Sequence, residues 1–195
     1  MLSKTIFGII LLLMISGLIF VSCMKRKDVN LKGTKPLSLF YDLSAKTIDG
    51  EIISMDNYKN KYILVVNVAS ECGYTPQYES LQKLYKEHKK DLAILAFPSN
   101  DFLNQEPGSN QEIKNFCKVN FGVKFDIFEK ISVKGNSQNI HPIYKWLSDK
   151  SENGWNSKKP TWNFCKYLID KDGLLVGFWG SAIDPLSPDI KNKIK

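Results

Sequence analysis

Cys72 is the residue whose position in this sequence best suits chemistry. It follows a nearly continuous apolar run, Tyr62 to Ala69, and precedes Thr75-Pro76, a pair typical of a helix start. Open α/β sheets place reactive groups at the carboxyl ends of their strands. The amide groups of a following helix stabilise a thiolate, which is a nucleophile and is readily oxidised. The alternative is a buried cysteine that acts as a small hydrophobic side chain, and position alone does not decide between the two.

The histidines and the other cysteines of the chain do not form a recognisable second site. His88 lies in a charged helix end and His141 precedes a proline, so no pairing of a histidine with a cysteine is evident. The four cysteines show no CxxC spacing, and no glycine-rich phosphate loop is present. We therefore expect neither a metal site nor a bound cofactor.

Length and composition indicate one globular domain with a short extension. The chain has 195 residues, of which 43% are hydrophobic and 24% charged. Its net charge is +7, but Arg26 is the single arginine among 27 basic residues, and acidic residues separate the lysines. Lysine lacks the bidentate fork that reads guanine edges and phosphates. We therefore expect a solvated basic surface and no nucleic-acid partner.

Residues 1–22 are expected to be a signal peptide or a membrane anchor. An apolar run from Ile6 to Val21 is followed by Cys23 and then by Lys25-Arg26-Lys27. The segment Phe20-Val21-Ser22-Cys23 resembles the lipobox of bacterial lipoproteins. That resemblance implies cleavage before Cys23, lipidation of its thiol, and a membrane-anchored protein that faces the periplasm.

Two other interpretations of this segment stay open. In an uncleaved anchor, the more positive flank at Lys25-Arg26-Lys27 would keep the domain in the cytoplasm. A cleaved secretory signal would instead release a soluble, exported protein. In each case residues 23–36 are expected to be a polar tether and residues 37–195 the folded domain.

Short apolar runs and helical patterns alternate along the rest of the chain. Asp49-Gly50 predicts an early β-hairpin, and Ser109-x-x-Glu112 has the spacing of a helix capping box. The expected elements in chain order are a hairpin within 39–53, a strand over 62–69, a helix from 76, a strand over 92–97, a helix over 110–119, an ambiguous run over 127–133, a helix over 141–150, a hairpin over 162–179 and a helix from 188. This order predicts a three-layer α/β sandwich around a mixed sheet, with an N-terminal β-hairpin.

Four segments, in the right order and spacing, resemble the glutathione peroxidase family in its cysteine-containing form. Together they span about Phe40 to Trp179. The segments are VNVASECGYTP (66–76), LAFPSNDFLNQEPG (95–108), FGVKFDIFEKI (121–131) and WNFCKYLID (162–170). The resemblance implies a thioredoxin-like fold. It also implies reduction of hydrogen peroxide or of organic and lipid hydroperoxides by a thiol co-substrate.

The resemblance further implies a catalytic tetrad at Cys72, Gln105, Trp162 and Asn163. The Cys72 thiolate would attack the peroxide and become a sulfenic acid. The two amides and the indole N–H are neutral donors, which suits them to orient a peroxide and to stabilise a thiolate. Taken without the resemblance, Gln105 would be interpreted as a loop residue and Trp162 as a core aromatic.

The physiological reductant stays open between glutathione and a thioredoxin-like protein. Thioredoxin-dependent members of the family carry a resolving cysteine, for which Cys117 is the candidate, although we expect it to pack with Ile113 and Phe116 in a helix. Cys165 is expected in the core. The preferred route therefore uses Cys72 alone with an external thiol, and a Cys72–Cys117 disulfide is the alternative. The stretch from 135 to 160 lacks the long loop of tetrameric relatives, so we expect a monomer with an open cleft.

A second class of function also stays open. The same scaffold could be a thiol–disulfide oxidase or a redox sensor that passes oxidation from Cys72 to a partner protein. A catalytically idle, membrane-anchored binding module is disfavoured, because all four residue types of the tetrad are present.

Overall fold

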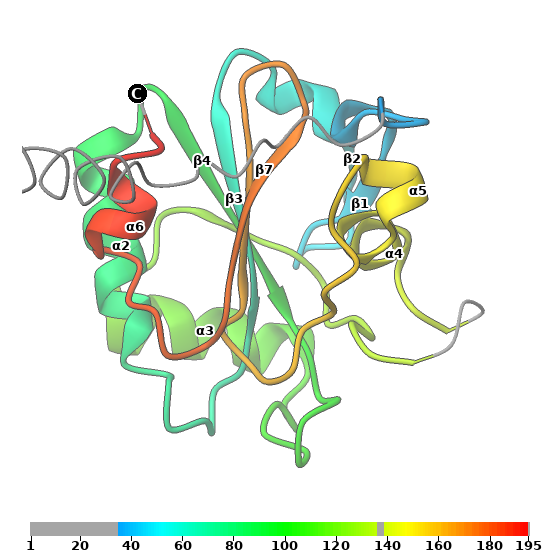
Figure 1. Cartoon of the computed structure of the whole chain (residues 1–195). Helices are drawn as coiled ribbons and strands as arrows, with labels where there is room; N and C mark the ends of the chain where they lie inside the picture. Colours follow the sequence, from blue (N-terminus) through cyan, green and yellow to red (C-terminus); the bar gives the residue numbers. More distant parts are fainter. Residues whose placement is uncertain (1–34, 136–138, 195) are drawn as a thin grey trace, which may run out of the picture. The chain divides into compact units, whose positions relative to one another are not determined.

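The computed structural model describes residues 35–135 and 139–194 (Figure 1). The expected signal peptide or anchor over 1–22, the candidate lipidation site Cys23 and most of the tether lie outside the described residues. In the part of the chain that is described, no helix is long and apolar enough to cross a membrane.

A five-stranded mixed sheet forms the centre of the domain, in the order β5-β4-β3-β6-β7. Strands β3, β4 and β5 are parallel to one another. Strand β6 is antiparallel to β3, and β7 is antiparallel to β6, so that β6 alone is reversed in this sheet. The strands are β3 (Tyr62–Val68), β4 (Leu92–Pro98), β5 (Asp126–Ile127), β6 (Lys166–Ile169) and β7 (Leu175–Trp179). Because β3 and β4 are central and covered on both faces, nearly every residue in them is buried, which explains their continuous apolar runs.

Helices cover both faces of this sheet, which gives the three layers seen in Figure 1. One face packs against α2 (Gln77–His88), α3 (Asn110–Phe121) and α6 (Pro188–Lys191). The other face packs against α4 (Pro142–Ser148), two short 3-10 helices, η1 (Phe40–Asp42) and η2 (Met55–Tyr58), and the hairpin of β1 (Ser44–Lys46) and β2 (Ile52–Ser54). The short helix α5 (Lys150–Asn153) lies against α4. The predicted three-layer sandwich with an N-terminal hairpin is therefore confirmed.

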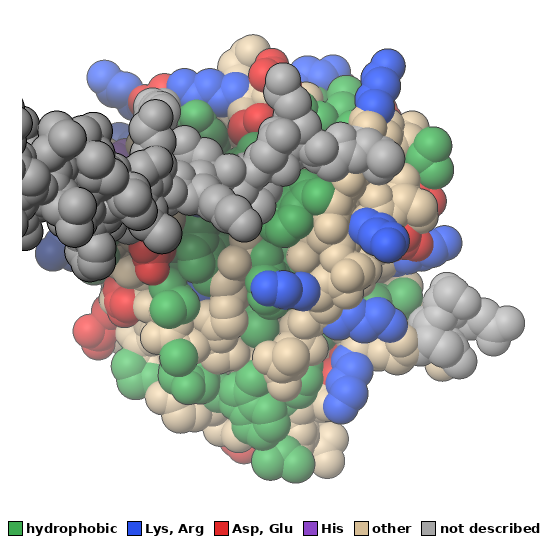
Figure 2. Space-filling model, in the orientation of Figure 1, with side chains coloured by type: hydrophobic (Ala, Val, Ile, Leu, Met, Phe, Trp, Pro, Cys, Tyr) green, Lys and Arg blue, Asp and Glu red, His purple; other side chains and the backbone are tan. Residues whose placement is uncertain are grey.

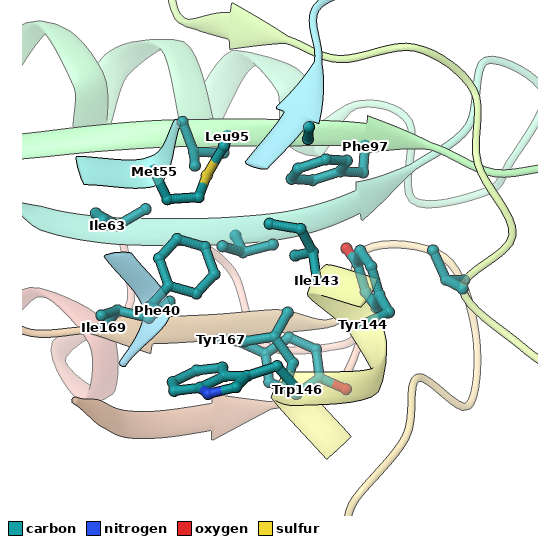
Figure 3. Close-up of a cluster of buried hydrophobic side chains, with 14 of the residues drawn as sticks. Phe40, Met55, Ile63, Leu95, Phe97, Ile143, Tyr144, Trp146, Tyr167 and Ile169 are labelled. Carbon is teal, nitrogen blue, oxygen red and sulfur yellow. The ribbon is translucent and has the colours of Figure 1, made fainter. Parts of the chain in front are cut away.

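Alternation along β3 divides the hydrophobic core into two clusters. Leu64 and Val66 point toward α2 and α3, whereas Ile63 and Val65 point toward the opposite layer. Figure 3 shows that second cluster, in which Phe40 and aromatic residues of α4 pack against the strands. Burial on both faces holds the strand ends in place, and with them the loops that follow the strands.

Several element boundaries differ from the expectations for local reasons. The helix after Cys72 begins at Gln77, because the Thr75 hydroxyl does not cap it: Thr75 Oγ1 accepts from the Cys72 N–H and donates to the Ala69 carbonyl. The capping box at Ser109 is present as predicted. The segment expected to be helical over 141–150 divides at Asp149, whose side chain caps a separate short helix.

Candidate active site

Three loops meet at one end of the sheet, which is the lower end in Figure 1. The loop after β3 carries Cys72, and the loop after β4 carries Gln105. Trp162 and Asn163 come just before β6, and β6 is antiparallel to β3. The start of an antiparallel strand lies beside the carboxyl ends of its neighbours, so the sheet topology brings all four predicted residues to the same end.

Cys72 occupies a tight turn between β3 and α2 and is 7% exposed. Its own N–H donates to Thr75 Oγ1 at 3.1 Å, and the Tyr74 N–H donates to the Cys72 sulfur at 3.4 Å. A backbone N–H directed at sulfur is a contact that stabilises a thiolate. The Cys72 sulfur thus lies at the end of β3, in a turn where one backbone N–H is directed at it.

Gln105 and Asn163 form a direct side-chain pair. Asn163 Nδ2 donates to Gln105 Oε1 at 3.1 Å, and this contact leaves the Gln105 Nε2 group available as a donor. Asn163 is fully buried, and its Oδ1 has no hydrogen-bond partner among the described residues. No hydrogen bond in the described part of the chain joins the Cys72 sulfur to either amide.

Hydrogen bonds to the backbone, two of them made by the Asn67 side chain, tie the three loops together. The Glu71 N–H donates to the Gln105 carbonyl at 3.0 Å, so the residue before the thiol is fixed to the second loop. Asn67 Nδ2 donates to the Trp162 carbonyl at 2.9 Å, and Asn67 Oδ1 accepts from the Cys165 N–H at 3.0 Å. Asn67 was not singled out from the sequence, although a lone polar residue in the apolar run of β3 is a detectable signal.

Trp162 is half-buried beside the Gln105 loop. Its ring centroid lies 5.7 Å from that of Phe102, which is itself buried. The indole therefore borders both the second loop and the segment that carries Asn163. Of the predicted tetrad, the structure pairs Gln105 with Asn163 and places Trp162 against the loop that holds Gln105.

Glu106, the residue after Gln105, is a buried carboxyl group that the sequence did not indicate. Neither of its carboxyl oxygens has a hydrogen-bond partner among the described residues. Burial raises the pKa of this carboxyl to about 7, and the nearby Ser70 and the Lys130 ammonium offset only part of the rise. Lys130 Nζ instead donates to the backbone carbonyls of Glu106 and Gly108, at 3.2 and 2.6 Å.

The remaining described cysteines are both fully buried free thiols. Cys117 faces the sheet from α3, in the same apolar cluster as Ile113. Burial raises the pKa of its thiol to about 11, so it is almost wholly protonated near neutral pH. Cys165 lies in the core as predicted, and the resolving role of Cys117 stays a prediction. No group of residues that could hold a metal ion occurs in residues 35–135 and 139–194.

A buried lysine, Lys166, supports the start of α2. Its ammonium donates to Gln77 Oε1, to the Ser181 carbonyl at 3.1 Å and to the Ile183 carbonyl at 2.6 Å. Gln77 Nε2 also donates to the Ser181 carbonyl at 2.7 Å. Burial lowers the pKa of Lys166 to about 8. This network joins β6, the first turn of the helix after Cys72, and the loop after β7.

Comparison with known proteins gives consistent matches over most of the chain. The family model described as glutathione peroxidase matches residues 40–148. The glutathione peroxidase of Lactococcus lactis subsp. cremoris is 47% identical over 147 residues, which cover 75% of this chain and 92% of that protein. The glutathione peroxidase-like peroxiredoxin 2 of Saccharomyces cerevisiae is 44% identical and covers 77% of this chain and 92% of its own.

Two further matches concern substrate and fold. The hydroperoxy fatty acid reductase of Synechocystis is 40% identical over 74% of this chain and 88% of that protein. The crystal structure of Trgpx in its apo form has a TM-score of 0.63 and 33% identity, covering 81% of this chain and 94% of that one. These likenesses confirm the predicted thioredoxin-like fold and the predicted family resemblance.

Proposed function

The chain belongs to the glutathione peroxidase family and is a thiol-dependent peroxidase, and from this premise we propose that Cys72 is its peroxidatic cysteine, with Gln105, Trp162 and Asn163 as its catalytic partners. One observation carries the proposal. Three loops that are distant in sequence bring these residues to the same end of the sheet, where the sulfur accepts a backbone N–H and the two amides are paired.

In the first step the Cys72 thiolate attacks the terminal oxygen of the hydroperoxide. The S–O bond forms as the O–O bond breaks, and the alkoxide or hydroxide leaves with a proton as alcohol or water. The neutral donors Gln105, Trp162 and Asn163 stabilise the attacking thiolate and the departing alkoxide or hydroxide. The product on the enzyme is the sulfenic acid of Cys72.

In the second step a thiol attacks the sulfenic sulfur, the S–O bond breaks, and water leaves. A second thiol then attacks the resulting mixed disulfide, which frees Cys72 and releases the oxidised co-substrate as a disulfide. We propose glutathione or a thioredoxin-like protein as the source of these thiols. Because Cys117 is fully buried and protonated, it can form a disulfide with Cys72 only after α3 opens locally.

The substrates proposed for this chain are hydrogen peroxide and organic hydroperoxides, including lipid hydroperoxides. The name of the Synechocystis relative, a hydroperoxy fatty acid reductase, supports the lipid class. A thiol–disulfide oxidase or sensor is not favoured, since the similar proteins named above are a glutathione peroxidase, a peroxiredoxin and a hydroperoxy fatty acid reductase. We propose a monomer, on the basis of the short stretch between 135 and 160.

The proposed location is a bacterial membrane, with the domain held at the periplasmic face by a lipid on Cys23. The support is the apolar run that precedes Cys23 and the lipobox-like residues 20–23. A signal anchor or an exported soluble form is the alternative. Incorporation of labelled fatty acid into the full chain, and its loss in Cys23→Ser, tests the lipidated form.

A coupled peroxidase assay tests the proposed function. NADPH consumption is followed with either glutathione and its reductase or thioredoxin and its reductase, for the wild type, Cys72→Ser and Cys117→Ser. We expect Cys72→Ser to abolish turnover with both couples. Cys117→Ser is expected to keep turnover with an external thiol, and loss of turnover in this variant would favour the disulfide route instead. Turnover that persists in Cys72→Ser would contradict the proposal.

A further inference from the structure

The loop between β4 and α3 holds an exposed leucine in an unfavourable backbone conformation. Leu103 and Asn104 have φ values of 52° and 54°, which lie in the left-handed region. Asparagine adopts that region readily, but leucine rarely does. Leu103 is also 78% exposed, so its side chain gains little from packing within the described residues. Glycine or asparagine would suit this position better if folding alone decided it.

The residues on both sides of Leu103 are firmly held. Phe102 is buried and packs against Trp162, and the Gln105 N–H donates to the Phe102 carbonyl at 3.2 Å. The Glu106 N–H donates to Asn100 Oδ1 at 2.9 Å. These anchors close a short turn whose tip is Leu103. The outward position of this leucine therefore follows from the geometry of the turn and does not reflect a loose loop.

The position of this turn connects it to the peroxidase site. Leu103 is separated by one residue from Gln105, and its neighbour Phe102 contacts Trp162, so the turn that carries the leucine adjoins two members of the proposed tetrad. Figure 2 shows hydrophobic side chains gathered at this lower end of the molecule. Strained backbone conformations cluster at functional sites, where the surrounding structure maintains them.

We propose that Leu103 is a specificity-determining residue that contacts the hydrocarbon chain of an organic hydroperoxide whose peroxide group is at Cys72. The inference rests on the proposed function, in which Cys72 attacks the peroxide. An alkyl chain is the occupant that fits, because it is attached to the reacting group and the exposed Leu103, at the tip of the turn that packs on Trp162 through Phe102, offers it an apolar contact. A protein partner would need a far larger surface, roughly 800 Å² on each side.

Three variants of the full chain separate this role from a structural one. Leu103→Asn introduces a residue that tolerates the left-handed backbone, and it removes the apolar surface. Leu103→Met keeps an apolar side chain. Val119→Asn removes the apolar surface of an equally exposed side chain, 80% exposed on α3, and is the matched control. Each is assayed for kcat/KM with linoleic acid hydroperoxide, below its aggregation threshold, and with hydrogen peroxide.

The measured quantity is the ratio of kcat/KM for the fatty acid hydroperoxide to that for hydrogen peroxide. We expect this ratio to fall about fivefold in Leu103→Asn, from loss of part of a leucine contact, and to change little in Leu103→Met and Val119→Asn. An unchanged ratio in Leu103→Asn would overturn the inference, and so would an equal fall in Val119→Asn.

Two further measurements test whether Leu103 serves the fold or a dimer contact instead. The melting temperature of Leu103→Asn is expected to equal or exceed that of the wild type, because asparagine relieves the backbone strain, and a clear fall would assign Leu103 to the fold instead. Sedimentation of the wild type and Leu103→Asn would reveal a dimer that depends on this leucine, which would also overturn the inference.

If the wild type reduces neither peroxide, the proposed function itself fails. If the wild type reduces both and the ratio is insensitive to Leu103, only the proposed contact with the acyl chain fails.

Discussion

Asn163 Nδ2 donates to Gln105 Oε1 at 3.1 Å, across 58 positions of sequence. The pair joins the loop after β4 to the segment before β6. It also determines the direction of the Gln105 amide, because an oxygen that accepts from Asn163 leaves the Nε2 donor for another partner. The proposed peroxide site thus depends on a contact between two loops and not on either loop alone.

This pairing predicts that the two amides act as a unit. Gln105→Ala is expected to lower the second-order rate of Cys72 oxidation by roughly a hundredfold, the usual effect of removing one transition-state donor. Asn163→Ala is expected to lower it by a similar factor, and the double variant by much less than the product of the two. Stopped-flow tryptophan fluorescence with hydrogen peroxide measures these rates. Strictly multiplicative effects would show that the pair has no joint role.

The buried carboxyl of Glu106 predicts a stability that falls as pH rises. Burial raises its folded pKa to about 7 from the ordinary value of 4.5, so the folded state holds this proton more tightly than the unfolded state does. The stability present below about pH 4.5 is therefore lost progressively up to about pH 7, by roughly 3 kcal/mol at most.

Glu106→Gln should remove that dependence. Urea unfolding at pH 5 and pH 8 is expected to show the free energy of unfolding of Glu106→Gln rising relative to the wild type as pH increases. A wild type and variant whose unfolding free energies change in parallel between these pH values would show that Glu106 does not titrate in this range.

The buried ammonium of Lys166 should matter far more to stability than a surface lysine. Lys166→Met would leave Gln77 Oε1 and the Ile183 carbonyl without this donor, while the Ser181 carbonyl keeps Gln77 Nε2, and the expected loss is about 2–4 kcal/mol in unfolding free energy. Lys114 is the matched control, because it forms an exposed ion pair with Asp49. Lys114→Met should lower the unfolding free energy by less than about 1 kcal/mol. Equal effects in urea titrations would contradict the assigned network.

Lys166 also predicts a pH dependence of opposite sign. Burial lowers its folded pKa to about 8 from the ordinary 10.5, so the unfolded state binds this proton more tightly. The contribution of Lys166 to stability should therefore rise between about pH 8 and pH 10.5. The wild type should gain stability relative to Lys166→Met over this interval in guanidinium unfolding, and a constant difference would contradict the shift.

Much of the fold could be predicted from local pattern. The apolar runs that became β3 and β4, the turn at Asp49-Gly50 and the capping box at Ser109 each depend on neighbouring residues alone. The prediction that Thr75 caps a helix was wrong, because its hydroxyl binds the backbone of Cys72 and Ala69 instead. These partners lie only three and six residues away, so the hydroxyl closes the turn around Cys72 in place of capping the helix, a choice that residue spacing does not reveal.

The chemistry of the site was only partly visible in the sequence. Cys72 could be identified from its position between a strand and a helix, but Gln105, Trp162 and Asn163 were recognised through the resemblance to a family. The pairing of Gln105 with Asn163 and the left-handed backbone of Leu103 required the structure. The pairing depends on how two loops that are distant in sequence pack against each other, whereas the left-handed conformation depends on how the turn of residues 100–106 closes.

Intact-mass analysis tests the central assignment most directly. The reduced wild type, Cys72→Ser and Cys117→Ser are each treated with one equivalent of hydrogen peroxide in the presence of dimedone. We expect one dimedone adduct, located on Cys72 by peptide mapping, in the wild type and in Cys117→Ser, and none in Cys72→Ser. An adduct on another cysteine, or no oxidation of Cys72 at all, would contradict its role as the peroxidatic residue.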